Sequence, residues 1–114
     1  MNDDKHLYIL WATGDPVTSE HMVLMYSTNA MLYGWWDKVT VIIWGAAQKL
    51  AAEDEAVRLK MDIAKKAGVE FTACVSCAVN LGLKEKLEND DIEVIRWGEK
   101  LSKLMQEGKH IITV

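Results

Sequence analysis

The chain of 114 residues has few of the residues that break or cross-link a polypeptide, with one proline and two cysteines. It contains no Gly/Ser-rich run, low-complexity tract or internal repeat that would mark a linker or a repeat array. Because a chain of this length can bury a core of its own, residues 1–114 are predicted to form a single domain.

Positive charge is also scarce. The 13 lysine and arginine residues are outnumbered by 17 aspartate and glutamate residues, for a formal net charge of -4. This balance argues against direct nucleic-acid binding, which needs a concentrated basic face.

The start of the chain lacks the basic and apolar regions of a signal peptide, and the longest uncharged stretch, residues 21–36, is too short and too polar to cross a bilayer about 30 Å thick. We expect a cytoplasmic protein that binds neither membranes nor nucleic acids, in a compartment where structural disulfides are uncommon.

Several familiar motifs are missing. Neither G-x-G-x-x-G nor G-x-x-x-x-G-K-[ST] occurs, which leaves nucleotide cofactors without support, and no G-x-S-x-G elbow points to a hydrolase. Structural zinc normally takes four ligands, whereas His6, His21 and His110 are isolated in the sequence. We therefore expect neither a cofactor nor a metal site.

Apolar, mostly β-branched runs alternate along the chain with segments of helical spacing. This alternation predicts an α/β fold, a three-layer α/β/α sandwich of flavodoxin- or Rossmann-like architecture with a parallel or mostly parallel five-stranded sheet, because crossover helices cover both faces of such a sheet. The expected strands are residues 7–11, 39–44, 69–73, 92–95 and 110–114. The first expected helix runs from a cap at Thr18 or Ser19 to residue 36, the second covers residues 54–67, and the third covers residues 77–87 with an interruption at Gly82. The last expected helix contains Leu101, Leu104 and Met105 and ends at Gly108.

Two helices carry a prediction about packing. In the segment 54–67, helical spacing places Ala56, Leu59, Ile63 and Ala67 on one face, which is expected to pack on the sheet. The first helix is apolar around most of its circumference, a pattern typical of a helix buried on more than one side. We expect a second subunit to provide the additional cover. The apolar residues in question are Met22, Met25, Tyr26, Met31, Tyr33, Trp35 and Trp36.

The two cysteines carry the main chemical signal. Cys74 ends the third predicted strand, and Cys77 follows in the first turn of the next helix. Ligands of open α/β sheets bind at the carboxyl ends of the strands, and the start of a helix offers unpaired N–H groups and a positive dipole end that favour a thiolate. Cys74 is thus predicted to be the reactive, partly exposed thiol. Cys77 is expected to be turned into helix packing and to react more slowly.

Other residues are expected to surround this thiol. Trp11, Trp44 and Trp97 each lie at or just past the carboxyl end of a predicted strand, where they would line an apolar pocket or act as ordinary packing and interface anchors. Gly14 and Asp15 follow the first strand at the same edge, and His21 in the next helix is near enough to assist. The spacing C-x-x-C also occurs in thioredoxins, but no proline separates these cysteines or lies downstream of them.

The segment C-V-S-C-A-V-N-L-G-L from Cys74 to Leu83, the order of the strands and the closing segment from Gly108 to Val114 resemble the DsrE/DsrF-like family over nearly the whole chain. The resemblance implies a compact α/β/α fold that assembles into homotrimers or homohexamers. It also implies a cysteine that carries persulfide sulfur between donor and acceptor proteins, in relays such as those of tRNA thiolation and dissimilatory sulfur metabolism. Cys74 matches the sulfur-carrying position, while Cys77 lies where several members have a small residue other than cysteine.

Three functions follow as hypotheses. The first is a cytoplasmic sulfur relay, with sulfurtransferase activity, in which Cys74 attacks a donor persulfide and holds its terminal sulfur. The second is peroxiredoxin-like thiol redox chemistry, in which Cys74 is oxidised to a sulfenic acid and Cys77 resolves it as a disulfide. The third is a non-catalytic, oligomeric module that binds a small molecule between its tryptophans.

Overall fold

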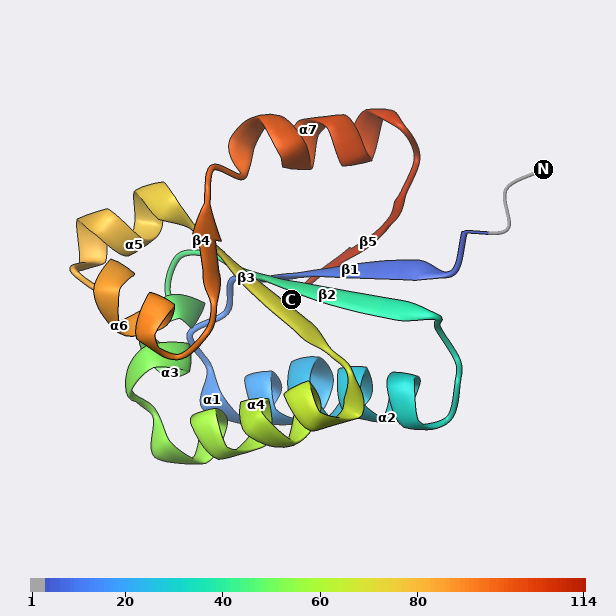
Figure 1. Cartoon of the computed structure of the whole chain (residues 1–114), viewed down its shortest axis with the longest axis horizontal. Helices are drawn as coiled ribbons and strands as arrows, with labels where there is room; N and C mark the ends of the chain where they lie inside the picture. The colour runs from blue at the N-terminus through green and yellow to red at the C-terminus, as the bar shows by residue number, and fades with distance from the viewer. Residues whose placement is uncertain (1–3) are drawn as a thin grey trace.

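A computed structural model describes residues 4–114, which fold around one five-stranded sheet (Figure 1). All four strand pairs are parallel, and the strand order is β4-β3-β2-β1-β5. The predicted α/β class and the predicted parallel sheet are confirmed. The strands are β1 (His6–Trp11), β2 (Lys38–Ile43), β3 (Glu70–Cys74), β4 (Glu93–Ile95) and β5 (His110–Thr113).

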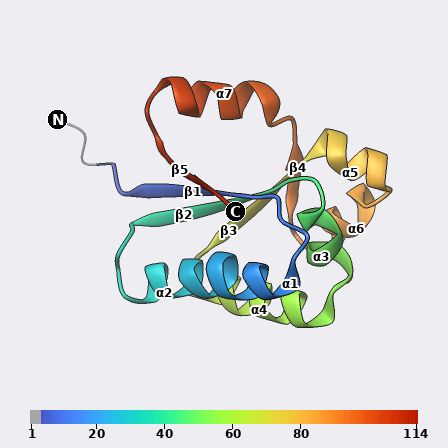
Figure 2. The ribbon, with the colours of Figure 1, turned by 180° about the vertical axis from the view of Figure 1, so that it is seen from behind.

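Helices cover both faces of the sheet, but unequally. The first long helix, residues 16–32, is made of three consecutive segments, α1, η1 and α2, and lies with α4 (Glu55–Ala67) on one face. Helix α7 (Gly98–Gln106) crosses the other face from β4 to β5 (Figures 1 and 2). Three shorter helices, α3, α5 and α6, lie together beside the sheet: α3 and α5 follow the carboxyl ends of β2 and β3, and α6 leads to the amino end of β4. The helices are α1 (Pro16–Thr18), the π-helical segment η1 (Ser19–Met25), α2 (Tyr26–Leu32), α3 (Ala47–Glu53), α4 (Glu55–Ala67), α5 (Val75–Leu81), α6 (Lys84–Asn89) and α7 (Gly98–Gln106).

The first helix begins earlier than predicted. Its cap is Asp15, not Thr18 or Ser19: the Asp15 carboxylate accepts hydrogen bonds from the Thr18 backbone N–H at 2.8 Å and from the Thr18 hydroxyl at 2.6 Å. Pro16 follows at the first helical position, where its missing N–H costs nothing. The π-helical segment after α1 was not predicted, because its apolar spacing is close to that of an α-helix.

The buried face of α4 is not the predicted one. Val57, Met61 and Ala64 face the sheet, whereas Leu59 and Ile63 are 62% and 51% exposed. Both sets of residues have helical spacing, so periodicity alone does not distinguish them. Helix α3 was also missed, because Asp54 separates it from α4 and caps α4 by accepting the Val57 N–H at 3.0 Å.

The core has two parts, one on each face of the sheet. The larger part lies under η1, α2 and α4 and contains Ile9, Val41 and Ala73. The smaller part lies under α7 and contains Ile42, Cys74 and Trp97. Successive residues of a strand point to opposite faces, so Cys74 faces α7 while its neighbour Ala73 faces the larger core. Partly buried residues that pack against the smaller part include Tyr8, Leu10, Trp44, Cys77, Ile95, Leu101 and Leu104.

The described residues include no helix with both the length and the apolar character needed to cross a bilayer.

Candidate functional site

Cys74 is the last residue of β3 and the N-cap of α5, with an extended backbone at φ -74 and ψ 122. This places it at the carboxyl edge of the sheet, as predicted from the sequence. Its side chain packs with Ile42 and Trp97 beneath the start of α7, and the residue is only 5% exposed. The expectation that Cys74 would be partly exposed was wrong, because the tryptophan that follows β4 covers it.

Cys77 lies in the first turn of α5 and is more exposed than Cys74, the reverse of the predicted order. Both thiols are free. Burial raises the pKa of the Cys77 thiol, and a hydrogen bond from the Gly45 N–H partly offsets this rise. The neighbouring Cys74 raises the pKa of Cys77 further, through its charge and through a side-chain hydrogen bond. The thiol of Cys77 thus lies in the same cluster as that of Cys74, and its surroundings disfavour the thiolate.

Two loops at the same edge pack against each other and support Cys77. Gly45, which contacts the Cys77 sulfur, follows β2 and has φ +59, a conformation that favours glycine. Gly14, in the loop after β1, approaches the neighbouring Ala46 so closely that a β-carbon on Gly14 would lie 3.1 Å from the Ala46 Cβ. Gly14 thus contacts the loop that supports Cys77, rather than the cysteine itself.

Gln48, in the first turn of α3, is a site residue that sequence analysis missed. Its side chain is fully buried, and its Nε2 donates to the carbonyl oxygens of Ile43 at 3.1 Å and of Cys74 at 2.9 Å. Its Oε1 is buried and makes no hydrogen bond to any residue between 4 and 114. The available signal was a single amide in a segment with several alanines, at Ala46, Ala47, Ala51 and Ala52.

Trp97 holds a fixed position over Cys74. Its indole Nε1 donates to the Thr72 hydroxyl oxygen at 2.9 Å, and that hydroxyl donates to the Glu93 carbonyl oxygen at 2.8 Å. The Lys100 ammonium lies 5.8 Å from the centre of the Trp97 ring. Trp44 packs against the same cluster. Two of the three tryptophans expected around the thiol are thus brought together with both cysteines.

The remaining predicted site residues are engaged elsewhere. Trp11 is fully buried in the larger core on the opposite face of the sheet, where its Nε1 donates to the Ser19 hydroxyl at 2.8 Å. Its predicted place beside the thiol was therefore wrong. Asp15 caps the first helix, and the exposed His21 pairs its Nδ1 with the Val17 carbonyl oxygen at 2.9 Å.

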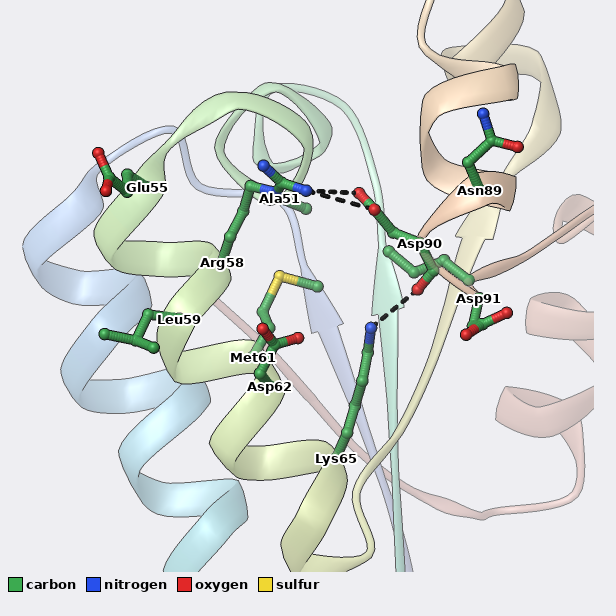
Figure 3. Close-up of a pocket in the computed structure, with 11 residues that line it drawn as sticks. Ala51, Glu55, Arg58, Leu59, Met61, Asp62, Lys65, Asn89, Asp90 and Asp91 are labelled. Carbon is green, nitrogen blue, oxygen red and sulfur yellow. Dashed lines mark hydrogen bonds and ion pairs between the residues drawn. The ribbon is translucent and has the colours of Figure 1, made fainter.

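A cleft of about 530 Å³ lies away from the cysteines, between α4 and the turn after α6 (Figure 3). Its two cations are both bound to Asp90: the Arg58 Nη2 lies 3.3 and 3.1 Å from the carboxylate oxygens, and the Lys65 Nζ lies 2.9 Å from the carbonyl oxygen. The lining also includes acidic Glu55 and Asp62. The cleft therefore offers an anion no free positive charge, and its polar contacts serve to hold α4 against the turn.

Among residues 4–114, no three or more His, Cys, Asp or Glu side chains come together in a group that could hold a metal ion. The chemistry that this edge of the sheet offers is that of two neighbouring thiols, one buried among apolar side chains and one nearer to solvent.

These features define a small parallel α/β/α protein with a thiol pair at the carboxyl edge of its sheet. The chain belongs to the DsrE/DsrF-like family, whose model matches residues 7–114. Among solved structures, it is similar to the conserved protein of unknown function BT1422 from Bacteroides thetaiotaomicron, with 32% identity, a TM-score of 0.93 and coverage of 96% of this chain and 95% of that one. The protein of unknown function MTH1491 from Methanobacterium thermoautotrophicum has the same fold, with 15% identity, a TM-score of 0.71 and coverage of 98% and 100%. Comparison with the curated proteins gave no significant match.

Proposed function

We propose that this protein is a cytoplasmic sulfur carrier, with sulfurtransferase activity, that holds persulfide sulfur on Cys74 and exchanges it with sulfur-donor and sulfur-acceptor proteins. The observation that carries the proposal is the free thiol of Cys74 at the carboxyl end of β3, where it packs with Ile42 and Trp97 away from water. Membership of the DsrE/DsrF-like family supports it, and the sequence resemblance implies that Cys74 is the sulfur-carrying cysteine.

The proposed loading step is a transfer of one sulfur atom. The Cys74 thiolate attacks the terminal sulfur of a donor R–S–SH, a new S–S bond forms on Cys74, and the donor leaves as its thiolate. The apolar packing of Ile42 and Trp97 limits the access of water and of competing thiols to the loaded sulfur.

Intact mass spectrometry after incubation with glutathione persulfide tests this function. A Cys77→Ser variant, which keeps a single thiol at position 74, is expected to gain one sulfur atom. A Cys74→Ser variant is expected to gain none at that position, with an unchanged circular dichroism spectrum as the control for folding. Failure of the Cys77→Ser variant to gain sulfur would refute the carrier role.

The packing of Cys77 against the cluster that contains Cys74 favours a second candidate, thiol redox chemistry. Peroxide would oxidise Cys74 to a sulfenic acid, and Cys77 would attack that sulfur, which forms a disulfide and releases water. The expected mass change of the wild type after treatment with peroxide is the loss of two hydrogens. If the protein gains sulfur from a persulfide but does not close a disulfide with peroxide, the carrier role stands alone.

We propose also that the protein assembles with copies of itself, as a trimer or a hexamer. Support comes from an apolar surface shared by the first long helix and α4, where Met25 and Ile63 are each 51% exposed on either side of a groove of about 180 Å³. Burial of exposed apolar area favours association. Leu59, on the same helix as Ile63, is also exposed.

A further inference from the structure

The two cysteine side chains are close enough to react with each other. Cys74 is the N-cap of α5 and Cys77 occupies its third helical position, so the pair has the C-x-x-C spacing at the start of a helix. Cys77 packs against the small cluster that contains Cys74, and both thiols are free. Any group attached to the Cys74 sulfur therefore has a second thiol beside it.

We propose that Cys77 discharges the sulfur held on Cys74 as hydrogen sulfide, so that the protein releases sulfide from a persulfide as well as carrying it. This inference rests on the proposed function, because it requires a persulfide on Cys74. It gives Cys77 a role in the fate of the sulfur, which the carrier function alone does not need.

The chemistry balances without an added oxidant. The Cys77 sulfur attacks the Cys74 Sγ, a Cys74–Cys77 disulfide forms, and the persulfide S–S bond breaks with its electron pair on the terminal sulfur. That sulfur leaves as HS⁻ and takes up the proton lost by Cys77, so Cys–S–SH and Cys–SH give a disulfide and H₂S. The two cysteine sulfurs are oxidised and the transferred sulfur is reduced. A second turnover needs a dithiol reductant to reopen the disulfide.

The contacts favour attack on the inner sulfur. Cys77 packs against the cluster in which the Cys74 side chain is buried, next to the inner sulfur, whereas attack on the terminal sulfur would pass the sulfur to Cys77 without releasing it. Burial raises the pKa of the Cys77 thiol and the Gly45 N–H only partly offsets this rise, so the discharge step is expected to speed up as the pH rises and more Cys77 becomes thiolate, the attacking species. The loop that presents this N–H is fixed by the left-handed conformation of Gly45 and by the close approach of Gly14 to Ala46.

A single-turnover experiment tests this role. Wild type, Cys77→Ser, Cys77→Ala and the control Ser76→Ala, which changes an exposed neighbour in the same turn, are loaded with glutathione persulfide without oxygen and then freed of donor. Released sulfide is trapped with a bimane reagent, and the protein is analysed by intact and peptide mass spectrometry. Wild type and Ser76→Ala are expected to release one sulfide per chain and to close the Cys74–Cys77 disulfide.

The Cys77 variants are expected to keep the extra sulfur on Cys74. They are expected to release sulfide at least about tenfold more slowly than wild type, because they lack an intramolecular thiol. Equal retention in wild type and Cys77→Ser would overturn the inference and leave the carrier role intact, as would recovery of the sulfur on Cys77. If both Cys77 variants fold but never gain sulfur, the carrier role fails and the inference with it. Circular dichroism of each variant verifies folding.

Discussion

Gln48 and Cys74 are joined by a hydrogen bond of 2.9 Å from the Gln48 side-chain amide to the Cys74 carbonyl oxygen. The same nitrogen donates to the Ile43 carbonyl oxygen at 3.1 Å, so one buried side chain of α3 ties together the ends of β2 and β3. The place of Cys74 is therefore set by α3 as well as by the helix that follows the cysteine.

Replacing Gln48 by methionine is expected to lower stability by about 1–3 kcal/mol, because two buried carbonyl oxygens lose a donor while the side-chain length is kept. The loss of stability is expected near the lower end of this range, because the substitution also removes the buried Oε1 that has no hydrogen-bond partner among the described residues. Urea unfolding measures the change. Gln106→Met, at an exposed position of α7, is the matched control and is expected to change stability by less than about 0.5 kcal/mol. Equal stability of the two variants would show that Gln48 does not secure the site.

The thiols provide a prediction about pH. Burial, the charge of Cys74 and the hydrogen bond between the side chains raise the pKa of Cys77, so its alkylation rate is expected to rise with pH later than that of an ordinary thiol. The Cys74→Ala variant loses both the charge of Cys74 and the hydrogen bond between the side chains. The pH midpoint of the Cys77 alkylation rate is therefore expected to move to lower pH. Iodoacetamide labelling, resolved by peptide mass spectrometry, measures both profiles. A midpoint that stays in place or moves to higher pH would contradict the proposed contact.

The sequence was sufficient for the sheet because its β-branched runs are separated by segments of helical spacing, and a parallel sheet accommodates that alternation. It was not sufficient for the side of the sheet on which each tryptophan lies. Trp11 is paired with Ile43 in the strand register, and Ile43 with Ala73. That row of side chains faces away from Cys74. The register between strands decides that Trp11 and Trp97 lie on opposite faces of the sheet, and the sequence of a single strand does not reveal that register.

The site itself was predictable in part. The end of a strand followed by a helix start placed Cys74 at the carboxyl edge, because both signals are local. Its burial depends on Trp97, which follows β4 further along the chain, and its anchoring depends on Gln48, in a helix that periodicity did not reveal. Contacts between residues far apart in the sequence are what local patterns leave undetermined.

The proposed assembly gives a test on the apolar surface. Wild type is expected to sediment as a trimer or a multiple of one, and the double variant Met25→Glu, Ile63→Glu as a monomer, because both substitutions put charge in an apolar contact. Met31, also apolar, is unsuited to this test: it packs against the core, with its Cε only 3.1 Å from the position of a β-carbon on Gly68.

Val79→Glu, at an exposed position of α5, is the control for added charge and is expected to leave the assembly unchanged. Analytical ultracentrifugation at micromolar concentration reads out the state of each variant, and circular dichroism checks that each one folds. A monomeric wild type under these conditions would rule out the assembly.

The hydrogen bond between Trp97 and Thr72 is expected to control access to Cys74. Thr72→Val keeps the side-chain shape but removes the acceptor of the indole N–H, so stability is expected to fall by about 1–3 kcal/mol. Because Trp97 packs on Cys74, its release is also expected to speed alkylation of Cys74, measured in a Cys77→Ser background that leaves one thiol. The control is Thr113→Val, the same substitution at an exposed position of β5. If Thr72→Val and Thr113→Val give the same stability and the same alkylation rate, Trp97 does not restrict the thiol.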